Sequence, residues 1–223
     1  MTVIDTPIAT QPRADVILFE NASWELYELL LRDRDAAGQH FKITYDEGRM
    51  SIMSPLPIHE AIKTFLARMI ECADLEQDVG ITSFGSTTWR RKDLAKGLES
   101  DECYYIGLDP DFDQTKPVDL TLEPAPDLAI EVDITHNPLD RMALYARLGV
   151  KEVWRYTGQQ VEINVLGADG RYTKVFQSTA LPFMNEDVIN RFVVMLSTSG
   201  ERKTIREFRK WVRTLPPPAA PID

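Results

Sequence analysis

Cysteine is scarce in this chain: only Cys72 and Cys103 occur among its 223 residues. Two thiols can form at most one disulfide, which argues against a disulfide-stapled scaffold or a thiolate metal cage and favours a reducing compartment. No apolar run approaches the roughly 20 residues that span a bilayer. The first residues also lack the basic and apolar regions of a secretory signal, so we expect a cytoplasmic protein without a membrane segment.

An excess of positive charge is also missing. Acidic residues outnumber basic residues by 35 to 25, which gives a formal net charge of −10. An indiscriminate polyanion binder carries the opposite sign, so any contact with nucleic acid must be local. The chain contains no GxGxxG, GxxxxGK[ST] or GxSxG motif, which argues against dinucleotide, P-loop and serine-hydrolase chemistry.

Both ends of the chain differ in composition from its middle. Residues 1–16 combine prolines with small polar residues, and 215–223 are rich in proline, so we expect flexible tails around one domain at 17–214. Helical and strand patterns alternate within that domain. This succession predicts an α/β or α+β fold in which a mixed sheet is flanked by helices.

Capping residues and hydrophobic periodicity place the main elements. Ser23 is a good cap for a helix over 24–34, and Gly149 is a good end for a helix that starts at Asn137. The other expected elements are a hairpin over 41–54 turning at 46–48, a helix over 57–75, strands at 81–89, 102–106, 127–134 and 153–156, a long connection over 107–126, a hairpin over 161–177 and a basic helix over 202–214.

The strand expected at 127–134 carries an unusual set of acids. Because side chains alternate along a strand, Asp127, Glu131 and Asp133 share one face, and neighbours on that face are about 7 Å apart. Acids this close repel one another, and a hard divalent cation between them removes that repulsion. The alternative is the solvent-facing side of an edge strand, and the spacing alone does not decide between the two.

Two further acids lie upstream of this strand. Asp101 stands at the entry to the strand expected at 102–106, where it either joins the first cluster through strand pairing or serves as a turn residue. Glu60 lies in the first turn of the helix expected from residue 57, where the helix dipole favours an acid without any function. Its neighbour His59 is equally consistent with a cap, a surface residue or a ligand.

Two longer stretches resemble a known family. They are GLESDECYYIG at 97–107 and PDLAIEVDITHNPLDRMALYARLGVKEVWRY at 126–156. Both are similar to the Uma-two family of nucleases, which belongs to the PD-(D/E)XK, restriction-endonuclease-like superfamily. The segment SPLPIHEAIKTFLARMIE at 54–71 fits the N-terminal half of that family, and the resemblance extends over about residues 20–195.

The resemblance implies a restriction-endonuclease-like mixed sheet flanked by helices, and it implies roles for particular residues. Asp101 matches the first acid, Glu131 the acid of the (D/E)XK motif, and Glu60 an acid on the preceding helix. The lysine of the motif is replaced by Asp133. Family members often carry a later lysine four residues before a tyrosine, and here that position holds Arg141, which stays charged and does not accept a proton.

The resemblance therefore implies a DNA endonuclease that hydrolyses phosphodiester bonds with Mg²⁺ or Mn²⁺. Asp101, Glu131 and Asp133 are the expected metal ligands, and Arg141 is expected to stabilise charge in the transition state. The basic helix at 202–214 can contact DNA, face solvent or contribute to a homodimer. Arg141 in the lysine position also leaves open a weakened or inactive nuclease fold that binds DNA or a protein partner.

Overall fold

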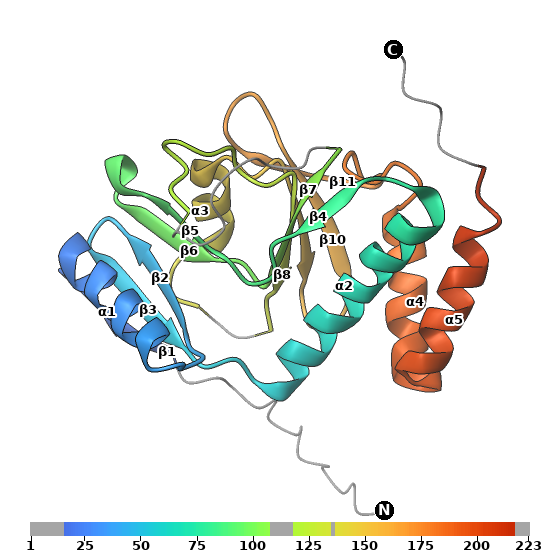
Figure 1. Cartoon of the computed structure of the whole chain (residues 1–223), viewed down its shortest axis with the longest axis horizontal. Helices are drawn as coiled ribbons and strands as arrows, with labels where there is room; N and C mark the ends of the chain where they lie inside the picture. Colours follow the sequence, from blue (N-terminus) through green and yellow to red (C-terminus); the bar gives the residue numbers. More distant parts are fainter. Residues whose placement is uncertain (1–15, 108–117, 135–136, 217–223) are drawn as a thin grey trace, which may run out of the picture.

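The computed structural model describes residues 16–107, 118–134 and 137–216. Most of the two expected tails, much of the expected connection at 107–126, and His136 lie outside the described residues. Within the described part, two β-sheets and five α-helices form an α+β fold (Figure 1). None of the described helices combines the length and the apolarity that crossing a bilayer requires.

The first sheet, sheet A, is antiparallel throughout and has the order β1-β3-β2-β6-β5. Its strands are β1 (Val16–Phe19), β2 (Lys42–Asp46), β3 (Arg49–Met53), β5 (Thr88–Arg91) and β6 (Lys96–Glu99). The predicted hairpin is confirmed as β2 and β3. It turns at Glu47 and Gly48, which both have a positive φ, as a tight two-residue hairpin turn requires.

The second sheet, sheet B, has the order β11-β10-β9-β8-β7-β4. Its strands are β4 (Ile81–Ser83), β7 (Glu102–Ile106), β8 (Leu128–Val132), β9 (Glu152–Tyr156), β10 (Val161–Leu166) and β11 (Tyr172–Val175). The strands β8 and β9 are parallel and the remaining pairs are antiparallel, so the predicted mixed sheet is confirmed. The strand expected at 81–89 divides into β4 and β5, which belong to different sheets.

Helices cover both sheets (Figure 1). They are α1 (Trp24–Ala36), α2 (Pro57–Gln77), α3 (Arg141–Leu148), α4 (Glu186–Ser199) and α5 (Glu201–Val212), with a 3₁₀ turn at Lys92–Leu94. Helices α2, α4 and α5 pack on one face of sheet B, and α3 fills the space between sheet B and strands β5 and β6. Helix α1 packs on sheet A.

The strand β8 lies at the centre of this arrangement. It pairs with β7 on one side and β9 on the other, and both of its faces are covered. Leu128, Ile130 and Val132 pack in the cluster beneath α2, whereas Ala129 packs in the cluster around α3. The face that carries Glu131 is therefore buried against α3, which excludes the solvent-facing edge strand for this residue.

Helix α3 starts later than expected, and one helix was not expected at all. Helix α3 begins at Arg141 with Asp140 as its cap, because the Asp140 carboxylate accepts a hydrogen bond from the amide of Ala143 at 3.0 Å. The side chain of Asn137 instead accepts a bond from the amide of Leu139 at 2.9 Å, which forms a turn before the helix. Helix α4 was not expected from the sequence, although Asn185 caps it with a bond from the amide of Val188.

The contact between α1 and β6 requires a glycine at position 97. Gly97 faces the buried ring of Tyr27, and a β-carbon added to Gly97 would lie 2.7 Å from Cε1 of that ring and closer still to its hydroxyl. We expect Gly97→Ala to lower the free energy of unfolding by about 1–3 kcal/mol through overpacking, as measured by urea denaturation.

Gly167→Ala is the matched control for this prediction. Its added β-carbon would come closest to the end of the flexible Asp169 side chain, and the backbone carbonyl of Arg171 lies at 3.4 Å, an ordinary contact distance, so a loss below about 0.5 kcal/mol is expected. Equal losses in the two variants would show that Tyr27 does not pack as tightly as the structure indicates.

Candidate active site

Strands β7 and β8 bring two acids together near one end of sheet B. Asp101 directly precedes β7, and its amide donates to the carbonyl of Ile130 at 3.2 Å. The amide of Val132 returns a bond to Asp101 Oδ2 at 2.5 Å. Glu131 lies between these two β8 residues, so the pairing beside β8 brings the Asp101 and Glu131 carboxylates close together.

Asp101 is fully buried and is surrounded by donors. The ammonium group of Lys42 bonds to Oδ1, and Nε2 of His59 lies 3.3 Å from Oδ2. Burial alone would raise the pKa of Asp101, but the charge and hydrogen bond of Lys42, together with the charge of Arg141, hold the pKa below its usual range. The carboxylate therefore remains ionised inside the protein.

Glu131 is held by a two-pronged bond to a buried arginine. Arg141 donates from Nε to Oε1 at 2.5 Å and from Nη2 to Oε2 at 2.7 Å, and the hydroxyl of Tyr145 donates to Oε2 at 2.8 Å. The same guanidinium donates to the hydroxyl of Thr44 and to the carbonyl of Glu99, both at 2.8 Å. Burial alone would lower the pKa of Arg141, but the charge of Glu131 keeps it raised.

A small hollow separates the two carboxylates. Its volume is about 10 Å³, which is close to the minimum needed by a single water-sized sphere. The lining residues come from two strands, two connecting segments and two helices: Met53, His59, Asp101, Glu131, Val132, Asp133, Asn137 and Arg141. The hollow therefore lies where β3 of sheet A meets the ends of β7 and β8 of sheet B and the first turns of α2 and α3.

The other predicted site residues occupy different positions. Asp133 reaches the rim of the hollow, but its Oδ2 atom accepts two bonds from Arg155. Glu60 keeps 45% of its side chain exposed, pairs with Lys63 at 3.2 Å, and does not line the hollow. Of the predicted acids, only Asp101 and Glu131 are both buried and adjacent to the hollow.

Lys42 and Thr44 were not identified as site residues from the sequence. Both lie on β2 and point toward the site, whereas Ile43 and Tyr45 between and beyond them pack beneath α1. The alternation of polar and apolar residues was the available signal. It did not identify a site, because polar residues on one face of a hairpin usually face solvent.

The donor atoms fit one hard cation better than a cluster of cations. Hydrogen bonds from the described residues use two of the roughly four lone-pair positions of Asp101 and three of those of Glu131, so each carboxylate keeps at least one position that no described residue fills. Among the described residues, no three Asp, Glu, His or Cys side chains converge as a metal site. Mg²⁺ needs no such group, since it often binds through one or two carboxylates and keeps several waters.

A comparison with protein families agrees with the resemblance seen in the sequence. The model of the Uma2 family, described as "Putative restriction endonuclease", matches residues 24–193. No curated protein matches the chain. A crystal structure of "a putative nuclease belonging to DUF820 from Anabaena variabilis" aligns with 14% identity and a TM-score of 0.43, over 76% of this chain and 90% of that one.

The pairing of Glu131 with Arg141 leads to a stability prediction. Arg141→Met leaves a buried carboxylate without its cation, so we expect a loss of about 3–5 kcal/mol in the free energy of unfolding in metal-free buffer. Adding Glu131→Gln should recover about half of that loss or more, because a neutral amide needs no counter-charge. Chemical denaturation of the single and double variants measures both effects.

Arg155→Met is the control, because it breaks an ion pair at the rim of the hollow instead of a buried one. The side chains of Arg155 and Asp133 are 36% and 32% exposed, so this change should cost no more than about 1 kcal/mol. If the double variant is no more stable than Arg141→Met alone, the burial of an unpaired charge is not the cause of the loss.

Proposed function

Because the chain belongs to the Uma2 family of restriction-endonuclease-like proteins, we propose that it is a DNA endonuclease that hydrolyses phosphodiester bonds with Mg²⁺ or Mn²⁺. One observation carries this proposal: two buried carboxylates, one just before β7 and one on β8, border one ion-sized hollow, and each keeps a lone pair that no described residue fills. Asp101 and Glu131 are the residues that would hold the ion. Asp133 at the rim and Glu60 outside the lining are given no ligand role.

The residues around the two acids have separable tasks in this proposal. The amide of Val132 fixes the direction of the Asp101 carboxylate, while Arg141 and Tyr145 fix that of Glu131. Fixed oxygens lower the cost of organising the site at the moment of reaction. A bound divalent ion supplies the remaining chemistry by polarising a phosphoryl oxygen and lowering the pKa of an attacking water.

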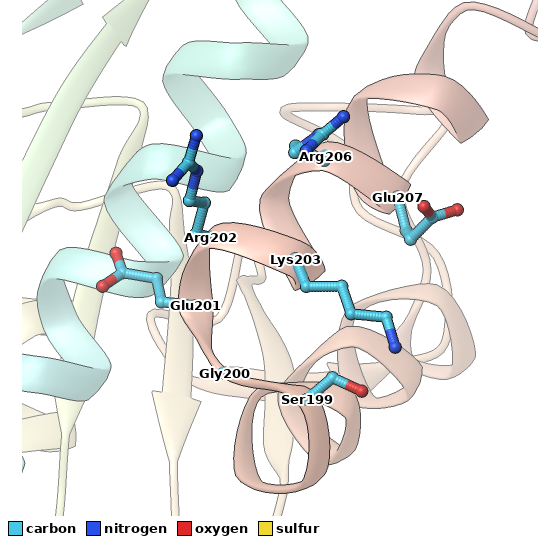
Figure 2. Close-up of a pocket in the computed structure, with 7 residues that line it drawn as sticks. All are labelled: Ser199, Gly200, Glu201, Arg202, Lys203, Arg206 and Glu207. Atoms are coloured by element: carbon cyan, nitrogen blue, oxygen red, sulfur yellow. The ribbon is translucent and has the colours of Figure 1, made fainter.

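The basic face of α5 supports DNA as the substrate. Arg202, Lys203 and Arg206 are exposed, and no ion pair to another described residue is formed by any of the three. Figure 2 shows their side chains extending from the first turns of α5. They line a hollow of about 700 Å³ at the junction of α4 and α5. Cations that are free of partners are available for phosphates.

Other basic residues are less available. Arg209 and Arg213 both bond to Glu76 on α2, which ties α5 to that helix. On β5, Arg90 pairs with Glu28 and Arg91 pairs with Asp93. The cationic surface open to DNA is therefore narrower than the sequence suggests, which suits a protein with a net charge of −10.

A second function is favoured by the same ion pairs. Asp101 and Glu131 are already neutralised by Lys42 and Arg141, so the fold needs no metal to hold them. A descendant that has lost hydrolysis and binds DNA or a protein partner would show this arrangement too. DNA retardation without cleavage would distinguish that module from the enzyme.

Catalysis by the paired acids can be tested with isosteric variants. We expect plasmid nicking by the wild type with Mg²⁺ or Mn²⁺ and none with EDTA. Glu131→Gln and Asp101→Asn should each lower the rate by at least about 100-fold, because each removes a charge from the site. Asp46→Asn is the matched control, since this carboxylate also pairs with a lysine but lies outside the hollow. Equal nicking by all four proteins would rule out the proposed site.

The role of α5 in DNA binding can be tested with two double variants, each of which removes two positive charges from a different part of this helix. Arg202→Gln with Arg206→Gln should weaken DNA binding and reduce the slope of log K against log salt by up to about 1.8. Arg209→Gln with Arg213→Gln removes an equal charge from residues already bonded to Glu76, so it should change the slope less. Fluorescence anisotropy over a salt series measures both, and identical slopes would contradict the assignment.

A further inference from the structure

Lys42 is a buried lysine that reaches the site from the other sheet. Its side chain is 5% exposed, and it crosses from β2 in sheet A to Asp101 beside β7 in sheet B. The ammonium group bonds to Asp101 Oδ1 and, at 3.3 Å, to the carbonyl of Ser100. An ammonium group has three N–H donors, so one remains without an acceptor among the described residues.

Arg141 is held in place much more firmly. Four of its five N–H donors bond to the two oxygens of Glu131, the hydroxyl of Thr44 and the carbonyl of Glu99. The planar guanidinium cannot turn toward a new partner without breaking several of these bonds at once. Arg141 is therefore a structural partner of Glu131, whereas the ammonium of Lys42, on a flexible stem, can redirect its donors.

The charge balance of the site favours the same assignment. Asp101 and Glu131 carry two negative charges, and Lys42 and Arg141 carry two positive charges. A divalent cation on the carboxylates would leave two positive charges in excess within a buried space, which is costly unless an anion enters. Since Arg141 is fixed, Lys42 is the cation that can turn to that anion.

We propose that Lys42, and not Arg141, donates to a non-bridging oxygen of the scissile phosphodiester and stabilises its negative charge during hydrolysis. This inference rests on the proposed nuclease function and names a residue that does part of its chemistry. The other buried lysine in the described part of the chain, Lys96 on β6, pairs with Asp46 and Glu47, and Lys151 pairs with Asp127. Neither lines the hollow or contacts a residue that does.

The test compares Lys42→Met with Lys96→Met in the full chain. Both remove a buried, paired lysine, so both should lower thermal stability. Only Lys42→Met should lower kcat on plasmid DNA with Mn²⁺, by about 100-fold or more, the effect of removing one charge-stabilising donor. Its affinity for Mn²⁺ alone, measured by calorimetry, should not fall, because a competing cation has been removed from Asp101.

Two more variants separate the loss of the positive charge at residue 42 from a loss of folding. Lys42→Gln keeps a donor for Asp101 but removes the charge, so its kcat should fall as that of Lys42→Met does. Lys42→Arg keeps the charge but places it on a planar guanidinium, so its kcat should lie between those of Lys42→Gln and the wild type. A kcat within twofold of the wild type for Lys42→Gln at saturating Mn²⁺ would overturn the assignment while leaving the nuclease function intact. A wild type that does not cleave DNA would overturn both.

Discussion

The structure depends on the neutralisation of two carboxylates inside the protein. Asp101 and Glu131 are buried, and neither could remain ionised there without a cation and several hydrogen bonds. Their cations come from distant parts of the chain: Lys42 from sheet A and Arg141 from α3. Because an unpaired buried charge costs several kcal/mol, these elements must assemble together. The two sheets are thus joined by polar contacts as well as by the packing around α3.

This arrangement gives the site an asymmetry that the two acids alone do not have. Glu131 is held by a rigid, multiply bonded guanidinium and a tyrosine hydroxyl, whereas Asp101 is held by a flexible ammonium and a backbone amide. One side of the hollow is therefore fixed and the other can rearrange. A hydrolytic site benefits from both properties, since fixed oxygens orient a cation and a movable positive charge follows the phosphate.

Local signals predicted much of the fold. The cap at Ser23, the turn at Glu47 and Gly48, and the glycine that ends α3 are each set by residues within a few positions, and the structure contains all three. Other features depend on more distant residues. Strands β4 and β5 were expected as one strand, because Gly85 between them can mark a break but does not show that they join different sheets. Asn137 has the chemistry of a cap, but Asp140 occupies that position.

The candidate site also combines features set by local sequence with features set by distant residues. The sequence by itself determined which acids exist, that Asp101 stands at the entry to one expected strand and that Glu131 lies on the next. The resemblance to a nuclease family implied a role for both. Only the tertiary structure decided that Glu131 is buried against α3, that Asp133 binds Arg155 at the rim, and that Lys42 from sheet A enters the site. The physical reason is that the ionisation and bonding of a carboxylate depend on its burial and on nearby charges. Those neighbours are set by how the sheets and helices pack, which spacing along the chain does not specify.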